Sequence, residues 1–178
     1  KKKKKHKVVG RSNEKLGSEI VIVWGCDPGA SGAFSLFDAG NGVVEVYDMP
    51  IVEVRGKKVI SPQLVRDILA QHDAPLWIEQ VSARPGQGVT SMFNFGKAYG
   101  VVLGVAAGLG IATNYVTPQQ WQKSVRCPAG KDGSRARAME LMPAYSHFWA
   151  RKKDDGRADA ALIAYYGFTY ARGVESAD

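Results

Sequence analysis

Residues 19 to 32 read EIVIVWGCDPGASG, an apolar run followed by an acid and a glycine-rich turn. The β-branched run up to Gly25 predicts a buried first strand. Asp27 follows this strand directly, ahead of a Pro-Gly turn, so a carboxylate stands at the strand end. Such a carboxylate is costly to bury unless a cation or a hydrogen-bond donor compensates it. Asp27 is therefore either an ordinary turn residue or part of a charged site.

Outward from this strand, the sequence predicts the order βββαβαβα with additional helices. Further strands are expected at 33–38, 43–49, 76–80 and 112–116, with an Asn-Gly hairpin signal between the first two of these. Helices are expected at 61–72, 91–109, 118–125, 134–142 and 154–170. Hairpin-connected strands followed by alternating strands and helices predict an α/β fold, a five-stranded mixed sheet with helices on both faces.

The 178 residues suffice for one domain with a proper core, expected at 19–173 between a disordered basic arm at 1–18 and a tail at 174–178. The first fifteen residues hold eight Lys or Arg and one acid, which accounts for the whole net charge of +7. Such an arm suits phosphate binding or nuclear import, and a solvated tail is the alternative. Because the first residue is a lysine, we interpret the N-terminus as trimmed or processed.

Several acids follow predicted strands or open the last predicted helix, and the predicted sheet brings the strand ends to one edge. Glu79 ends the predicted strand LWIEQ as Asp27 ends the first, and acids on neighbouring parallel strands converge. Asp155 and Asp159 open the last helix four residues apart, on one helical face, whereas Asp154 is interpreted as a cap. Acids without histidine or cysteine suit hard cations, chiefly Mg²⁺ or Mn²⁺. Two such ions can activate water at a phosphodiester.

A basic stretch accompanies the last acids. Residues 123–157 hold nine bases and four acids, an excess that suits a phosphate-backbone site, although a solvated helix face is the other interpretation. Trp121 and Trp149 are interpreted as core aromatics rather than base-stacking residues. Two cysteines without a CxxC pair and three scattered histidines argue against a disulfide framework and a zinc site. The apolar stretch around 99–109 is too short and glycine-rich for a membrane span.

Four segments resemble one known family. Residues 24–32 (WGCDPGASG) resemble the first-strand motif of RuvC-like Holliday-junction resolvases, members of the ribonuclease H-like nuclease superfamily. Residues 78–80 (IEQ) resemble their second acidic motif, and residues 152–160 (KKDDGRADA) resemble their C-terminal one. The loop at 83–88 and the helical segment at 95–100 are similar to the phage and plastid branches. The resemblance spans about 20–167 and implies a ribonuclease H-like fold.

The resemblance also implies an activity and a site. A homodimer would bind a four-way DNA junction and nick two strands symmetrically, leaving 5′-phosphates, with two Mg²⁺ per active site and Mn²⁺ as a substitute. Asp27, Glu79 and Asp159 would be metal ligands. Bacterial members carry an acid or histidine three residues before the last Asp, where this chain has Gly156. Asp155 is the substitute that keeps the helical face.

Basic and polar residues complete the expected site. Lys131 matches the family's catalytic basic position better than Lys123, which stands one residue beyond the lysine of bacterial members. Bacterial members also have an aromatic wedge where this chain has Ser82, so strand separation would fall to Met92, Phe93 or the preceding loop. The residues expected to contact DNA are Arg84, Gln87, Lys97, Lys123, Lys131, Arg135, Lys152 and Lys153.

Two other functions stay open at this point. A catalytically silent junction-binding protein would accommodate the glycine at position 156. An actin-like ATP-binding protein would use the Asp-Pro-Gly-Ala-Ser-Gly turn for phosphate, but 178 residues do not supply its two lobes. The small-residue helix at 91–109 is either the dimer seam or a helix packed on its own sheet. The expected location is a reducing intracellular compartment, namely a bacterial or phage-infected cytoplasm, a DNA-containing organelle or a nucleus, and not the secreted space.

Overall fold

The computed structural model describes residues 22–80, 86 and 88–173 of the chain. The predicted basic arm, the start of the first predicted strand, most of the predicted loop at 82–88 and the tail lie outside these residues. All five predicted strands and all five predicted helices are present, with ends shifted by a few residues.

Five strands form one mixed sheet in the order β3-β2-β1-β6-β7. They are β1 (Ile22–Asp27), β2 (Ala33–Asp38), β3 (Val43–Asp48), β6 (Leu76–Glu79) and β7 (Thr113–Val116). β2 pairs antiparallel with both β1 and β3, whereas β6 lies parallel to both β1 and β7. The first strand extends two residues further than predicted, so Asp27 is its last residue rather than part of the turn.

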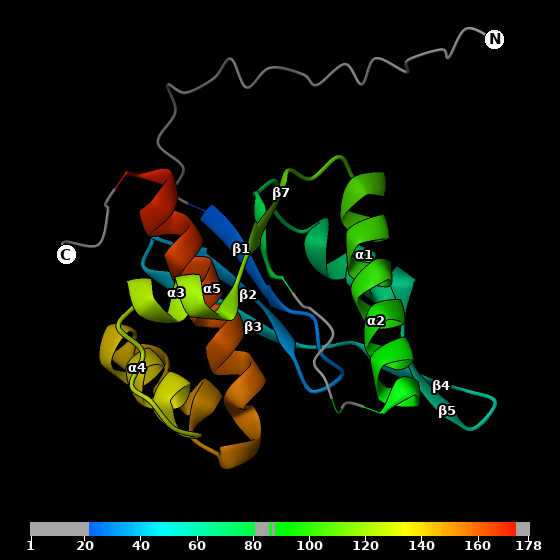
Figure 1. Ribbon diagram of the computed structural model, residues 1–178. Helices are drawn as coiled ribbons and strands as arrows, with labels where there is room; N and C mark the ends of the chain where they lie inside the picture. Colours follow the sequence, from blue (N-terminus) through cyan, green and yellow to red (C-terminus); the bar gives the residue numbers. More distant parts are fainter. Residues whose placement is uncertain (1–21, 81–85, 87, 174–178) are drawn as a thin grey trace, which may run out of the picture.

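Helices cover both faces of the sheet, as predicted (Figure 1). They are α1 (Pro62–Leu69), α2 (Val89–Gly108), α3 (Pro118–Ser124), α4 (Gly133–Leu141) and α5 (Asp155–Ala171), with 3-10 turns at Pro143–Trp149 and Lys152–Asp154. α5 packs on one face together with α3 and α4, and α1 and α2 pack on the other. None of the described helices is both long and apolar enough to cross a membrane.

Alternation along the strands decides which side chains face α5. Trp24 belongs to the core beneath α1 and α2, whereas Val23 belongs to the core beneath α5. Because successive side chains of a strand point to opposite faces, Asp27 shares the face of Val23. Trp77 of β6 also lies in the α5 core, so Glu79 faces the same way. Both strand-end acids are therefore on the side of the sheet that α5 covers.

Gly25 allows α5 to pack directly on β1. A Cβ atom at Gly25 would lie 2.2 Å from the carbonyl oxygen of Ala160 and 2.4 Å from the backbone nitrogen of Ala164, distances that no side chain tolerates. The helix backbone can approach the strand only because this position lacks a side chain. Asp159, the neighbour of Ala160, is thereby carried toward the sheet.

No element was predicted between Met49 and Ser61, where the structure has a second, two-stranded sheet. β4 (Ile51–Val54) and β5 (Lys57–Ile60) form an antiparallel hairpin. The two turn residues, Arg55 and Gly56, have φ angles of 52° and 73°, as a type I′ turn requires. Asn-Gly or Asp-Gly is the sequence signal for this turn, so Arg-Gly left the hairpin unrecognised.

Candidate active site

Asp27 and Glu79 end two neighbouring parallel strands. The β1–β6 ladder pairs Cys26 with Ile78, so the next residue of each strand, Asp27 or Glu79, lies beside the other. Both side chains face α5. The structure thus brings together two acids that are far apart in the chain, at the carboxyl edge of the parallel strands, where α/β sheets commonly place their sites.

The start of α5 presses against Asp27. A Cβ atom at Gly156 would lie 2.3 Å from the carbonyl oxygen of Ser31, 2.8 Å from Cα of Gly32 and 3.1 Å from Oδ2 of Asp27. A side chain at position 156 would therefore displace either the helix or the turn after β1. This close approach requires a glycine at position 156 as the helix and the turn stand.

Asp27 itself is half-buried. Burial raises the pKa of Asp27 above its ordinary value, and the 3.1 Å hydrogen bond that the backbone N–H of Gly29 donates to Oδ1 lowers it in part. Burial destabilises the ionised form of this carboxylate, and one amide donor offsets that effect only in part. A positive charge nearby would stabilise the ionised form further.

Asp159 completes a cluster of acids. Its pKa is raised to about 7, chiefly by burial; a hydrogen bond with Ser134 lowers it, and the negative charges of Asp27, Glu79 and Asp155 raise it. These four acids therefore share one electrostatic neighbourhood. Oδ1 of Asp159 is buried and has no hydrogen-bond partner among the described residues. A buried carboxylate oxygen without a donor is a natural place for a cation.

Trp121 fixes the side chain of Glu79. The indole Nε1 donates a 2.9 Å hydrogen bond to Oε1 of Glu79, and the ring of Trp121 is 0% exposed. The prediction that Trp121 is a core residue is confirmed, but its contact with Glu79 was missed. No spacing signal marks such a pair, because α3 comes near β6 only through the packing of the whole α5 side of the sheet.

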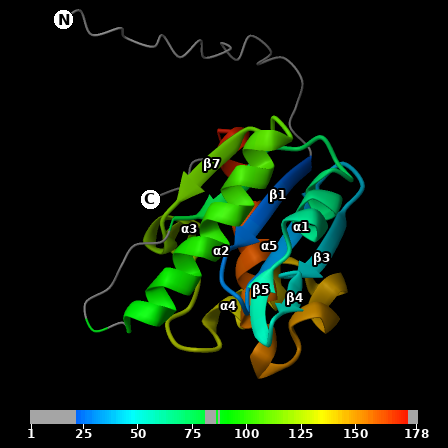
Figure 2. The same ribbon diagram turned by 90° about the vertical axis from the view of Figure 1, so that its right-hand side faces the viewer.

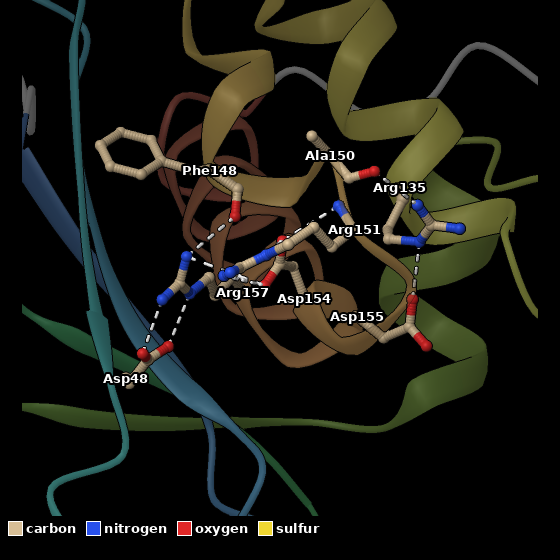
Figure 3. Close-up of polar contacts among 8 residues, drawn as sticks. All are labelled: Asp48, Arg135, Phe148, Ala150, Arg151, Asp154, Asp155 and Arg157. Carbon is tan, nitrogen blue, oxygen red and sulfur yellow. Dashed lines mark hydrogen bonds and ion pairs between the residues drawn. The ribbon is translucent and has the colours of Figure 1, made fainter.

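Asp155 is held by Arg135 across the α4–α5 contact. Nε of Arg135 donates to Oδ1 of Asp155 at 2.9 Å (Figure 3). The same guanidinium pairs with Asp132 and donates to the carbonyl oxygen of Ala150 at 3.4 Å, and the side chain is only 10% exposed. The predicted DNA contact at Arg135 is therefore not presented to a ligand in this structure. The guanidinium joins α4 to the start of α5.

Asp154 occupies the N-cap position of α5, as interpreted from sequence, but its side chain makes no capping hydrogen bond to that helix. Its carboxylate accepts hydrogen bonds from Nε and Nη2 of Arg151 at 3.0 and 2.9 Å (Figure 3). Arg157 donates to both carboxylate oxygens of Asp48 at 2.6 Å each, and thereby ties the helix to the end of β3. Asp155 is also paired with an arginine, but it is the acid at the helix start whose negative charge raises the pKa of Asp159.

The remaining predicted DNA contacts divide into two groups. Arg84 and Gln87 lie outside the described residues, as does Ser82, which stands at the expected wedge position. Lys97, Lys123, Lys131, Lys152 and Lys153 are all exposed. Lys131 is in the turn that leads into α4, and Nζ of Lys97 lies 5.4 Å from the ring centre of Phe93, which is 66% exposed.

The acid cluster fits a hard divalent cation in chemistry and charge. Its donors are carboxylate oxygens, burial raises the pKa of both Asp27 and Asp159, and one oxygen of Asp159 lacks a donor. In the described part of the chain, no three acidic, histidine or cysteine side chains are arranged to enclose an ion as they stand. Ion binding would therefore require side-chain rotations within the cluster.

Comparison with known proteins gives one sequence relative and several structural ones. No protein-family model matches the chain. It is 31% identical, over 154 aligned residues, to "Holliday junction resolvase MOC1, chloroplastic" of Chlamydomonas reinhardtii. That alignment covers 71% of this chain but only 18% of the relative, so the chain spans less than a fifth of that protein's length.

The structural relatives include RuvC of T. thermophilus in complex with a Holliday junction substrate and the yeast mitochondrial Holliday junction resolvase Ydc2. The first has a TM-score of 0.59 at 17% identity, covering 88% of this chain and 98% of the other. The second has a TM-score of 0.53 at 14% identity, covering 86% and 80%. At these identities the likeness establishes the fold.

Proposed function

We propose that this chain, which has the predicted ribonuclease H-like fold of RuvC-type resolvases, is a metal-dependent endonuclease that resolves four-way DNA junctions. It would nick two strands symmetrically and leave 5′-phosphates. The proposal depends on one observation, the side-by-side placement of Asp27 and Glu79 on the face where α5 adds the charge-coupled Asp159.

Asp27, Glu79, Asp155 and Asp159 would hold two Mg²⁺ ions, with Mn²⁺ as a substitute. When bound, the ions would supply Lewis acidity, which activates water and stabilises the leaving oxygen of a phosphodiester. The chain's own residues position this site: Trp121 orients Glu79, and Arg135 orients Asp155. Lys131 would neutralise phosphate charge near the scissile bond, and the exposed lysines at 97, 123, 152 and 153 would bind the DNA backbone, with Arg84 and Gln87 contacting the junction.

We also propose that α2 forms the seam of a homodimer. Val89 and Phe93 are 85% and 66% exposed, and the positions of Gly100 and Gly104 are open, so nothing in the described chain covers this helix face. Two copies of such a face could approach closely. Sedimentation analysis of Gly104→Leu tests this: the variant should be monomeric with an unchanged circular dichroism spectrum, whereas a dimer of wild-type stability would contradict the assignment.

The function is tested with a labelled synthetic four-way junction and a linear duplex of the same sequence. Wild-type protein should nick two opposite strands of the junction with Mg²⁺ and neither strand with EDTA, and it should spare the duplex. Products that DNA ligase reseals without further treatment would carry the expected 5′-phosphate. Nicking that persists in EDTA would refute the metal dependence, and equal cutting of the duplex would refute junction specificity.

Asp27→Asn separates catalysis from binding. The variant should lose nicking while keeping or tightening junction binding, because a negative charge near the phosphate is removed. Asp67→Asn, at an exposed aspartate on α1, is the matched control and should cut normally. A wild-type protein that binds the junction with Mg²⁺ or Mn²⁺ but never nicks it would instead indicate the catalytically silent alternative.

A further inference from the structure

The β4–β5 hairpin carries charge that the proposed site does not use. Its tip holds Arg55, Lys57 and Lys58 against a single acid, Glu53, and all four side chains are exposed. The three basic side chains make no ion pair with any residue in the described ranges. An exposed hairpin tip with an excess of positive charge is suited to a negatively charged partner.

The turn residue Arg55 is conformationally unfavourable. Its φ of 52° is in the left-handed region, where a side chain with a Cβ costs about 1 kcal/mol and where asparagine, aspartate or glycine is preferred. The adjacent Gly56 carries its φ of 73° without penalty. An arginine at such a position needs a reason other than turn stability, and unfavourable backbone conformations of this kind gather at functional positions.

The hairpin starts beside the acid cluster. The backbone N–H of Met49 donates a 3.0 Å hydrogen bond to the carbonyl of Gly32, in the turn that follows Asp27. Ser61 closes the other end by donating its N–H to Pro50 at 2.9 Å. The hairpin therefore projects from the end of the molecule where β1 and β6 finish and where α2 and α5 begin (Figures 1 and 2).

The size of the hairpin matches a length of duplex. Four residues per strand at about 3.3 Å each give a reach of about 13 Å. Along the axis of duplex DNA, each strand presents one phosphate about every 3.4 Å, so this reach corresponds to about four base-pair steps. Cations at its tip can thus meet the backbone of a DNA arm while the scissile phosphate lies at the acids.

We propose that the β4–β5 hairpin is a clamp for the phosphate backbone of a duplex DNA arm leaving the junction, with Arg55, Lys57 and Lys58 as its contacts. This inference rests on the proposed junction-resolving function and adds the partner of a second surface to it. The contacts are electrostatic and independent of sequence, because contacts of exposed cations with phosphate oxygens carry no sequence information.

The test is the salt dependence of junction binding by the full chain, measured in EDTA with a synthetic four-way junction. Each phosphate contact adds about 0.9 to the slope of log affinity against log salt, so Lys57→Gln with Lys58→Gln should reduce the slope by about 2. Affinity should fall by up to about 60-fold at 0.1 M salt and converge with wild type toward 1 M. Arg66→Gln with Arg172→Gln, which removes two charges far from the acids, is the matched control and should leave the slope unchanged.

Arg55→Asn gives a second measurement in which binding and folding should change in opposite directions. Asparagine suits the left-handed turn position, so the midpoint of thermal unfolding should rise while junction affinity at 0.1 M salt falls about 8-fold. A fall in both quantities would contradict the proposal. Arg55→Lys should retain wild-type affinity.

The outcomes distinguish a failure of the hairpin clamp from a failure of the proposed junction-resolving function. Wild-type protein that does not bind the junction would refute the proposed function itself. Wild-type protein that binds, together with a lysine double variant of unchanged affinity and slope, would refute only the hairpin clamp.

Discussion

The indole N–H of Trp121 donates a 2.9 Å hydrogen bond to a carboxylate oxygen of Glu79, 42 residues earlier in the chain. The donor belongs to a side chain with no exposed surface, so the bond is shielded from competing water. It directs this oxygen of Glu79 toward Trp121 of α3. A fully buried tryptophan thus acts as a positioning residue for a candidate metal ligand.

Trp121→Phe should raise the Mg²⁺ concentration needed for half-maximal nicking by about 10- to 100-fold, the usual effect of removing the partner of a ligand. Trp149→Phe is the control, since Trp149 is equally buried in the same core and its Nε1 has no partner among the described residues. Both variants should lose stability, but only the first should change the Mg²⁺ titration. Equal shifts in both would mean that Trp121 acts through packing alone.

Gly156→Ala should damage both stability and nicking. The added methyl group would meet the carbonyl oxygen of Ser31 at 2.3 Å, and overpacking of this kind costs about 1–3 kcal/mol. Gly96→Ala, at a helical glycine with open space around it, should instead stabilise the protein by up to about 1 kcal/mol. Chemical denaturation of the two variants measures the contrast. A neutral effect at position 156 would mean that the start of α5 can move away from β1 freely.

The raised pKa of Asp159 predicts a pH-dependent stability in the metal-free protein. Between pH 4 and 7 the unfolded carboxyl is ionised while the folded one keeps its proton, so stability should fall as pH rises through this window. The loss amounts to at most about 4 kcal/mol. Asp27, whose pKa is also raised, contributes with the same sign.

Thermal unfolding from pH 4 to 8 tests this expectation. Asp159→Asn should flatten the decline and unfold at a higher temperature than wild type at pH 7. Added Mg²⁺ should stabilise wild-type protein more at pH 8 than at pH 5, because the ion competes with the proton for the same carboxylates. A Mg²⁺ effect that is equal at both pH values would argue against metal binding at Asp159.

Arg135→Gln should behave as a structural variant and not as a DNA-contact variant. Its guanidinium joins Asp132 to Asp155, so its removal should lower the midpoint of thermal unfolding and leave the salt slope of junction binding unchanged. Lys131→Gln, at an exposed neighbour, should do the reverse and reduce that slope by about 1. A reduced slope in Arg135→Gln would restore the original prediction of a phosphate contact.

Local patterns were sufficient to predict most of the architecture. The β-branched run before Asp27, the apolar run that ends at Glu79 and the apolar stretch after Asp159 each contain their own signal, because strand and helix patterns depend on neighbours a few residues apart. The Arg55-Gly56 hairpin was missed for the same reason, since its turn lacks the residues that normally indicate one.

Residue order and periodicity are enough to place acids at strand ends and at the start of the last helix. The hydrogen bonds of Trp121 to Glu79 and of Arg135 to Asp155, and the lack of room for a side chain at position 156, become known only from the folded chain. Each of these relationships joins segments that meet through packing. The type of a residue does not identify its hydrogen-bond partner. The partner is decided when two elements pack together and bring one donor within reach of one acceptor.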